Sequence, residues 1–587
     1  MSTLVAAAGA GGSALASWTG PVLLLSGFAI VNVALLVTGR SSPIVRRIPD
    51  NLERLTGIPG WAASTVGLAL FGLLLAGQGF YSDVAWHVGL GRDDILFTSP
   101  HTSIFLGLQL ILLSSAVCIW TATATKVDTP FRVGALRVPA SAIPLGALGL
   151  AAVAGFPLDE LWHQAYGIDV TMWSPTHMLM ILGACFVGIA SWTVLGEAKV
   201  RARGGWKRGL HVVAAVLTLQ GLTAPLGEFA FGVPQFQQIF HPIIVSIAAG
   251  FALVAIRLVH GRWWGIGITT ISFLLQANVM GTEGETGPVD TRSPALYIGS
   301  ALLVELLARA IGTERVVRFA IATGVLVGTV GLATEWAWNA GAYQPWRASL
   351  LPDALVLSLI GAVGAALAGA AFARVVLKPA GDAPAERVPG RLVAAGAFAV
   401  FVVVALPLPR AVGDVDAALR VTPAGDGLAN VEVSLTPPDA ADDARWFQTT
   451  AWQGGGLVLA DMEEVEPGVF RSEEPVPVAG GWKSVVRLHR GGELMAVPVF
   501  LPRDDEIGEP EISGNRSGPM ESEKTYLLRE TRAGNAWFAP IVHGLLLIAI
   551  AAWVAAFVIA SRVIDGGRRG RGGRSVSRRV QPAGAPA

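Results

Sequence analysis

Residues 138–196 read VPASAIPLGALGLAAVAGFPLDELWHQAYGIDVTMWSPTHMLMILGACFVGIASWTVLG, and this stretch decides the fold class of the chain. Two apolar runs, near 138–157 and 176–196, flank a segment that holds Asp159, His163 and His177. A membrane-spanning helix needs about 20 mostly apolar residues, and each run is close to that length. The stretch therefore predicts a helical membrane hairpin whose connecting segment carries polar side chains at the membrane surface.

The rest of the chain repeats this apolar pattern. Of its 587 residues, 52% are hydrophobic and 15% are charged, whereas soluble domains carry about 25% charged residues. The sequence predicts a polytopic α-helical membrane protein in a lipid bilayer. Thirteen candidate spans lie near 18–39, 60–80, 101–124, 138–157, 176–196, 209–229, 239–258, 263–281, 294–312, 317–337, 353–375, 391–409 and 538–562.

The distribution of Lys and Arg predicts the orientation of these spans. Basic residues gather after the odd-numbered spans and in the tail after the last one. We expect that side to be the cytoplasmic face of the plasma membrane, with residues 1–17 outside and a disordered basic tail, 565–587, inside. Spans two to eleven then form five hairpins that open toward the exterior. Each exterior connection holds an acid: Asp83, Asp159, Glu228, Glu283 or Glu285, and Glu335.

A different kind of sequence separates the twelfth and thirteenth spans. From about 414 to 502, alternating segments such as 418–421 and 484–488 are divided by Gly and Pro turns. This pattern is typical of an antiparallel β-sandwich, here of about seven strands. The predicted organisation is a membrane domain of about 12 helices (18–409), an exterior sandwich with a polar linker or wrapped arm (410–536), and a final transmembrane helix (537–564).

Two groups of polar residues recur at an offset of 76 positions. Asp83, His87 and His101 match Asp159, His163 and His177. In both groups the carboxylate precedes the first His by four residues, and the second His follows 14 later. The chain has only nine His, and four of them are at these matched positions. Two imidazoles and one carboxylate are a metal-ligand set, so the sequence predicts two metal sites.

Local helix rules bring each group together. Asp83 and His87 are four residues apart, so on a helix they face the same way. We expect Ser99 to cap the next helix with Pro100 as its first residue, which places His101 in the first turn. Ser174 and Pro175 have the same roles in the second copy, so His177 is expected one residue deeper in its helix.

The carboxylates have two interpretations. A helix N-terminus disfavours cations, so a metal beside His101 or His177 needs a carboxylate nearby, and we expect Asp83 and Asp159 to supply it. The alternative is that each Asp simply pairs with its His at a helix end. Two matched copies favour the metal site.

Other polar residues give weaker signals. Glu228 with His241, and Glu335, resemble partial copies of the hairpin and are candidates for additional proton or metal groups. His211, His260 and His543 are expected to be interfacial or packing residues. Cys118 and Cys185 lie in apolar runs and form no C-x-x-C motif. Zero net charge argues against nucleic acid as a partner.

The segment His163-Gln164, Asp169 and Ser174-Pro175-Thr176-His177 resembles part of the C subunit of copper membrane monooxygenases, the particulate methane and ammonia monooxygenase group. The resemblance covers about 20 residues of the 587, and the same pattern recurs at residues 83–101. It implies that Asp159, His163 and His177 bind copper on the exterior side, that Asp83, His87 and His101 form a second such set, and that further membrane subunits participate. Family C subunits have far fewer spans, and this chain has one residue more between the two His.

The predicted sandwich offers a smaller resemblance. Residues 464–470 and 477–482 are similar to small exported sandwich domains found beside copper-handling membrane proteins. The domain has His489, Met462 and Met495 but no Cys, so it is not a copper-binding cupredoxin.

Two functions from different classes agree with these observations. In the first, copper at one or both sites activates oxygen and oxidises a small apolar substrate that arrives through the bilayer. Iron or zinc would also suit two His and one carboxylate. In the second, the protein transports or handles metal ions through a relay of acids and His sites, as internal repeats are common in transporters. The ligands are expected at the membrane rim rather than at its midplane, which favours the first function.

Overall fold

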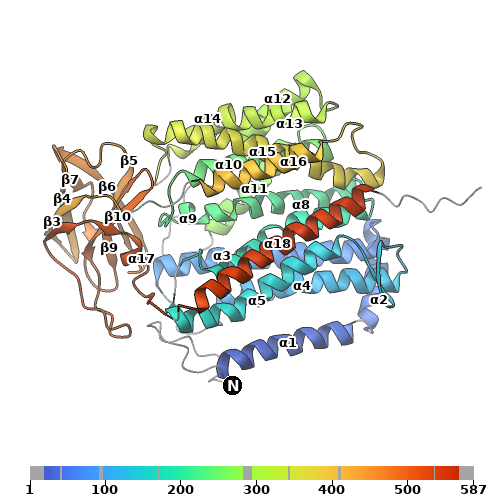
Figure 1. The fold of residues 1–587 in the computed structure, drawn as a ribbon, viewed down its shortest axis with the longest axis horizontal. Coiled ribbons are helices and arrows are strands. Elements are labelled where there is room, and N and C mark those ends of the chain that lie inside the picture. Colours follow the sequence, from blue (N-terminus) through green and yellow to red (C-terminus); the bar gives the residue numbers. More distant parts are fainter. Residues whose placement is uncertain are drawn as a thin grey trace, which may run out of the picture.

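A bundle of helices and a separate β-sheet domain make up the protein in this computed structural model, with the sheet against one end of the bundle (Figure 1). The structure describes residues 19–39, 42–91, 97–168, 171–281, 294–341, 344–406, 412–534 and 536–566. The predicted exterior N-terminus, most of the basic tail, and the acids Glu283, Glu285, Asp93 and Asp169 lie outside these ranges.

Every segment predicted to span the membrane is helical. The long helices are α1 Thr19–Gly39, α2 Pro43–Thr56, α3 Gly60–Gly89, α4 Ser99–Ala124, α5 Ala142–Tyr166, α6 Pro175–Cys185, α7 Val187–Glu197, α8 Gly205–Thr223, α10 Phe240–His260, α11 Trp264–Gly281, α12 Ile298–Ile311, α13 Val316–Leu326, α14 Leu332–Asn339, α15 Leu351–Leu377, α16 Gly390–Ala405 and α18 Phe538–Gly566. Two single-turn helices are α9 Gly227–Ala230 and α17 Lys524–Leu527.

Within the described ranges, nine helical segments are long and apolar enough to cross a membrane. They are Gly60–Gly89, Ser99–Ala124, Ala142–Tyr166, Pro175–Glu197, Gly205–Ala230, Phe240–His260, Val316–Asn339, Ala348–Ala380 and Phe538–Gly566. The chain is therefore a polytopic membrane protein, but thirteen spans are not confirmed. The predicted spans outside this group are α1, α11, α12 and α16. With 14 and 16 residues, α12 and α16 are shorter than the roughly 20 that a perpendicular span requires.

The hairpins α3–α4 and α5–α6 pack through glycines at matched positions. A Cβ on Gly107 would meet the Gly72 carbonyl and Ala76, and one on Gly183 would meet the Leu148 carbonyl and Ala152. The two sets of neighbours differ by 76 residues, the same offset as the polar groups. Side chains larger than hydrogen would push the two helices of each hairpin apart, so these glycines fix how closely the ends that carry Asp and His approach each other.

The sheet domain is a single antiparallel sheet rather than the expected sandwich of two. Its ten strands follow the order β11-β3-β4-β7-β6-β5-β9-β10-β12, with β8 beside β4. The strands are β3 Asp416–Gly425, β4 Leu428–Thr436, β5 Ala444–Trp452, β6 Leu457–Glu466, β7 Val469–Ser472, β8 Val476–Pro477, β9 Lys483–Arg490, β10 Glu493–Phe500, β11 Arg516–Pro519 and β12 Glu521–Ser522. A separate two-stranded ribbon, β1 Phe131–Val133 with β2 Leu136–Val138, joins α4 to α5.

Two features curl this sheet until it is nearly closed. The first half of β6 pairs with β5 and its second half with β7, so one strand joins what would otherwise be two sheets. The strands at the two edges, β11 and β12, are separated along the chain only by Met520, whose N–H donates to the Val415 carbonyl at 2.8 Å. The segment predicted as a linker therefore supplies the strands that bring the two edges together.

The sheet domain contacts the membrane domain through strands that are buried along nearly their whole length, β5 and β9. After β5, the Gln453 N–H donates to the Val88 carbonyl and the Gly455 N–H to the Gly89 carbonyl, both at 3.0 Å. The Gln453 side chain donates to the His87 carbonyl at 3.1 Å. These bonds satisfy carbonyls that the end of a helix leaves free, so the β5–β6 turn caps α3 directly behind His87.

Candidate metal centre

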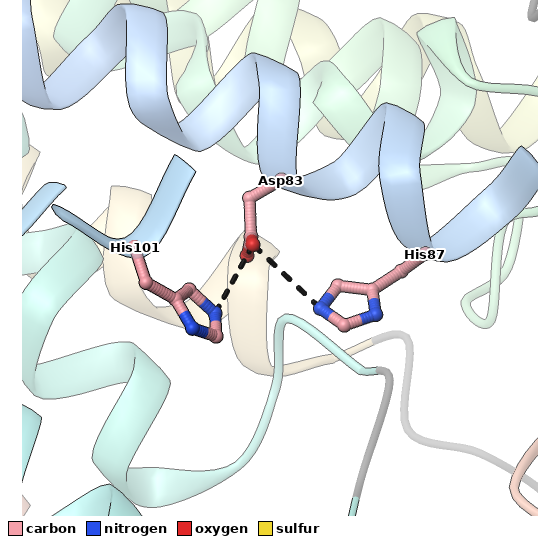
Figure 2. A group of neighbouring side chains, drawn as sticks. All are labelled: Asp83, His87 and His101. Carbon is pink, nitrogen blue, oxygen red and sulfur yellow. Dashed lines mark ion pairs between the residues drawn. The ribbon is translucent and has the colours of Figure 1, made fainter. Parts of the chain in front are cut away.

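The first predicted ligand set comes together between α3 and α4. The Nε2 atoms of His87 and His101 lie 3.7 Å and 3.1 Å from the same oxygen, Oδ1 of Asp83. Figure 2 shows His87 and His101 on either side of Asp83, with both rings turned toward its carboxylate. Asp83 Oδ1 is buried and has no partner in hydrogen-bond geometry among the described residues. A buried carboxylate oxygen whose only close neighbours are two imidazoles outside hydrogen-bond geometry is costly, and a cation bound between the three side chains would stabilise it.

The second predicted set has the same arrangement between α5 and α6. The Nε2 atoms of His163 and His177 lie 3.8 Å and 3.1 Å from Oδ2 of Asp159. The Asp159 side chain is 9% exposed, compared with 19% for Asp83. In each set all three ligand atoms lie within 4.8 Å of one another. Within the described residues these two triads are the groups of His, Cys, Asp or Glu that could hold a metal ion.

The helix starts differ from the prediction in one copy. Thr98, not Ser99, caps α4, and its hydroxyl accepts the His101 N–H at 3.3 Å. Ser174 caps α6 as expected, and its hydroxyl accepts the His177 N–H at 3.2 Å. Both His are thus the third residue after the cap, and the prediction that His177 lies one residue deeper is wrong. The cap was misplaced because Thr and Ser both cap helices well, and Pro fits the second helical position as well as the first.

Backbone carbonyls orient one imidazole in each triad. His87 Nδ1 lies 2.9 Å from the Gly91 carbonyl, and His177 Nδ1 lies 2.6 Å from the Thr171 carbonyl. A carbonyl only accepts, so each Nδ1 carries the proton and donates it. His177 Nε2 lies 3.1 Å from Asp159 Oδ2, which also only accepts, so both ring nitrogens of His177 face acceptors. A metal bound at Nε2 would take the place of the proton there, while the Nδ1–H hydrogen bond would hold the ring in position.

A hydroxyl distinguishes the second triad from the first. Thr176 Oγ1 donates to Asp159 Oδ1 at 2.6 Å, which leaves Oδ2 facing the two imidazoles. The position 76 residues earlier is Pro100, which has no donor. The carboxylate of the second triad is therefore oriented by a charge-assisted hydrogen bond, while that of the first is not.

Helix dipoles favour a cation at both triads more than the sequence suggested. His87 and His163 are in the last turns of α3 and α5, where the negative end of a helix dipole stabilises positive charge. The N-termini of α4 and α6, which oppose a cation, supply only the second His of each triad. Each site lies between one favourable and one unfavourable helix end.

Both triads face one cavity of about 220 Å³. Asp83, His87, His101, Asp159 and His177 line it, together with apolar side chains that include Leu73, Ile104, Leu108, Met180 and Leu217. Phe156, one turn before Asp159, lies between the triads with its ring centroid 6.3 Å from that of His101. Trp452, Gln453 and Leu527 of the sheet domain line its end.

The cavity occupies the half of the bundle next to the sheet domain. On α3 its lining runs from Leu73 to Val88, which is roughly 22 Å at 1.5 Å per residue. It takes residues from the first half of α4, from α6 between His177 and Cys185, and from the second halves of α5, α8 and α11. The two triads are at the sheet end of this space, and the apolar lining continues from them toward the middle of the helix bundle.

The additional candidate residues have different surroundings. Glu228 lines the cavity. His241 Nδ1 accepts the indole N–H of Trp346 at 3.2 Å, and its ring stacks on Phe229. Glu335 accepts the N–H groups of Leu296 and Tyr297 at 3.0 and 2.5 Å, just before α12 begins. In the described part of the chain, none of the three is grouped with other ligand atoms that could hold a metal.

Three functional features were not found from the sequence. Thr176 stands between two predicted motif residues, Pro175 and His177, but its contact with Asp159 joins two helices across 17 positions, which the spacing of the motif does not reveal. The carbonyls of Gly91 and Thr171 lie in loops, where sequence pattern gives little guidance. The contact of Gln453 with His87 joins positions 366 residues apart, which no local pattern can predict.

A buried charge cluster lies in the sheet domain beside the membrane domain. Glu523 Oε2 accepts from Arg487 Nε at 2.9 Å and lies 2.7 Å from His489 Nε2. Arg487 also donates to the Pro234 carbonyl in the loop that follows α9. Burial raises the pKa of Glu523, but Arg487 and His489 outweigh it and lower the pKa to about 2. The cluster ties the sheet to the loop that carries Gln235 into the cavity.

Comparison with models of known protein families, with curated proteins and with solved structures finds no match for this chain. The resemblance to the C subunit of copper membrane monooxygenases therefore remains a prediction from the short motif.

Proposed function

We propose that this protein is a membrane metalloenzyme that binds copper at both triads and uses oxygen to oxidise a small, largely apolar substrate in the cavity between them. The observation that carries the proposal is the convergence, in each triad, of two imidazole Nε2 atoms on one carboxylate oxygen. Both triads face the same cavity, so a bound substrate would be close to either metal.

The ligand geometry fits a transition metal. Two ligand atoms that each lie ~2.1 Å from one metal are at most about 4.2 Å apart, and the atoms of each triad lie within 4.8 Å. A decrease of less than about an ångström in the distances between the three ligand atoms would bring them within reach of one metal. Two imidazoles and one carboxylate suit copper, iron or zinc. The motif resemblance favours copper, which when bound would supply the activation of oxygen.

The chain's own residues have three tasks in this proposal. The Nδ1 donors of His87 and His177 hold their rings so that Nε2 faces the metal position. The apolar side chains from Leu73 to Leu108 bind the substrate by burying its surface. Trp452 and Leu527 of the sheet domain add apolar surface to the cavity, which would limit the access of water to a reactive centre.

The remaining features of the proposal concern origin and topology. We interpret α3–α4 and α5–α6 as two copies of one hairpin because their polar residues and packing glycines share the 76-residue offset. The sheet domain and both triads would be exterior, because Lys and Arg gather at the opposite ends of the helices. Further membrane subunits would extend the cavity, as the resemblance implies.

Metal-ion handling or transport is the second candidate. It is favoured by three carboxylates, Asp83, Asp159 and Glu228, which face one cavity. A transport path must reach both membrane faces, and the described lining of this cavity stays in the half of the bundle beside the sheet domain. We therefore place the enzymatic function first.

The deciding experiment is a metal count on purified full-length protein, measured by mass spectrometry after copper loading and removal of excess metal. We expect two copper ions per chain, one for each triad, and about one in His87→Ala or His163→Ala. His543→Ala, a change at an exposed His on α18, should keep both. A copper count that the triad variants do not change would overturn the proposal. Oxygen-dependent oxidation of a small alkane or alcohol by the loaded protein, with an added chemical reductant to supply the two electrons that reduce the second oxygen atom to water, then separates enzyme from carrier.

A further inference from the structure

One buried carboxylate in the cavity belongs to neither triad. Glu228 is on α9, is 5% exposed, and lines the cavity. Among the described residues, neither of its carboxylate oxygens has a partner in hydrogen-bond geometry. The indole N–H of Trp173 and the backbone of Gln235 interact with the carboxylate, but outside strict hydrogen-bond geometry in the described residues. A buried acid that has only such weak neutral donors is costly and, in a membrane domain, is by default a functional group.

The charge of the cavity lining has one sign. Its acidic residues are Asp83, Asp159 and Glu228, and no Lys or Arg lines it in the part of the chain that the structure describes. Lys524 acts on Glu228 from outside the lining, with its Nζ over the Phe236 ring. Copper at the triads would balance Asp83 and Asp159. Glu228 would remain without a counter-ion among the described lining residues.

The surroundings of Glu228 suit an organic cation better than a third metal ion. A metal needs several ligands, yet Glu228 belongs to neither of the groups of three His, Cys, Asp or Glu found among the described residues. Three aromatic rings line the same cavity: Phe80, Tyr81 and Phe231. Their centroids are 5.4 Å apart for Phe80 and Tyr81, and 5.9 Å apart for Tyr81 and Phe231. Aromatic faces and a carboxylate together are how proteins recognise ammonium groups.

We propose that the cavity binds a small organic ammonium ion, with its nitrogen against Glu228 and its alkyl part along the apolar lining toward the triads. The ammonium ion would be the substrate of the enzyme proposed above, so this inference rests on the proposed function. A space of about 220 Å³ has room for a short alkyl chain, since roughly 10–15 Å³ of such volume holds one water. The nitrogen lies at the carboxylate, so a carbon of the chain rather than the nitrogen is nearest to the metals.

The test compares two probes of equal length, n-butylammonium and n-butanol, which differ in charge. Their affinities for the full-length protein in detergent are measured by calorimetry, with saturation-transfer NMR as a second readout. We expect butylammonium to bind at least about tenfold more tightly, because a hydrogen bond to a charged partner contributes more than a neutral one. If the wild-type protein binds butylammonium and butanol with equal affinity, the proposal is wrong, and no variant is needed to show it.

Variants locate the binding group. Glu228→Gln should weaken butylammonium about 10- to 100-fold and leave butanol unchanged, while Glu228→Asp should keep the preference for the cation. Glu160→Gln is the matched control, since Glu160 is equally buried but accepts from Gln164 and is not among the lining residues. An unchanged preference in Glu228→Gln would also overturn the proposal.

Repeating the titration on chelator-treated protein separates this proposal from the proposed function. If the protein prefers butylammonium but binds no copper after loading, the metalloenzyme function is refuted and the ammonium site is not. Copper at both triads without a preference for butylammonium would refute the ammonium site alone.

Discussion

Replacing Thr176 by Val should weaken metal binding at the second triad while leaving the first unchanged. The Thr176 hydroxyl is fully buried and donates to Asp159 Oδ1 at 2.6 Å. Valine has nearly the same shape but no hydroxyl, so the carboxylate loses the bond that holds Oδ2 toward His163 and His177, and Ser174 loses its 3.1 Å hydrogen bond with Thr176. A hydrogen bond to a charged group contributes about 1.5–3 kcal/mol, and outer-shell partners typically account for about 10- to 100-fold in metal affinity. We expect a loss in that range.

The assay is a copper titration against a competing chelator, which resolves two binding constants per chain. Thr176→Ser keeps the hydroxyl and should behave as the wild type. The first triad is an internal reference, because Pro100 stands where Thr176 does in the second. In Thr176→Val the two constants should approach each other. If they stay as far apart as in the wild type, with the protein folded by thermal melting, the hydroxyl does not support the metal site.

At limiting copper, His163→Ala should lower the bound metal more than His87→Ala, because the better-supported second triad fills first; equal losses, or loss of both ions from one change, would indicate a single shared site. Asp159→Asn should insert normally and lose most metal at the second triad, and full retention with an unchanged spectrum would remove the carboxylate from the ligand set. A protease added to intact cells should cut within residues 412–534, and cleavage only in inside-out vesicles would reverse the orientation. Because the pKa of Glu523 is lowered to about 2, its contribution to stability is complete above about pH 4.5 and is lost as the pH falls toward 2; it amounts to about 3 kcal/mol, and Glu523→Gln should flatten the acid dependence of the melting temperature in that window.

The ligands of the candidate site could be predicted because their grouping is local. Asp83 and His87 are one helical turn apart, and a short loop returns His101 to them, so spacing alone brings all three together. The same reasoning could not predict which of the two triads binds metal more tightly. Their difference is the donor at Thr176 against Pro100, and its importance depends on which carboxylate oxygen it reaches in space.

The helices could be predicted from apolar length, but the number of spans could not. A run of apolar residues indicates helix as soon as it is long enough to be buried, whereas crossing the membrane also requires about 30 Å of helix. The 14 residues of α12 satisfy the first condition only. In the sheet domain, alternation in β3 and β4 identifies strands. The alternation cannot show that β6 pairs with both β5 and β7, because pairing is decided by contacts in space and not by the pattern of one strand. A sandwich was therefore predicted, and the structure has one curled sheet.

The sheet domain and the metal triads form one structural unit. The turn after β5 caps the end of α3 at the residues that follow Asp83, and Gln453 donates to the carbonyl of His87 itself. A helix end that carries a ligand would otherwise fray, because its last carbonyls have no partner within the helix. The same turn lines the end of the cavity. The domain therefore supports the helix end that carries His87 and lines the cavity through one set of contacts, and neither role requires it to bind metal, in agreement with its lack of a cupredoxin ligand set.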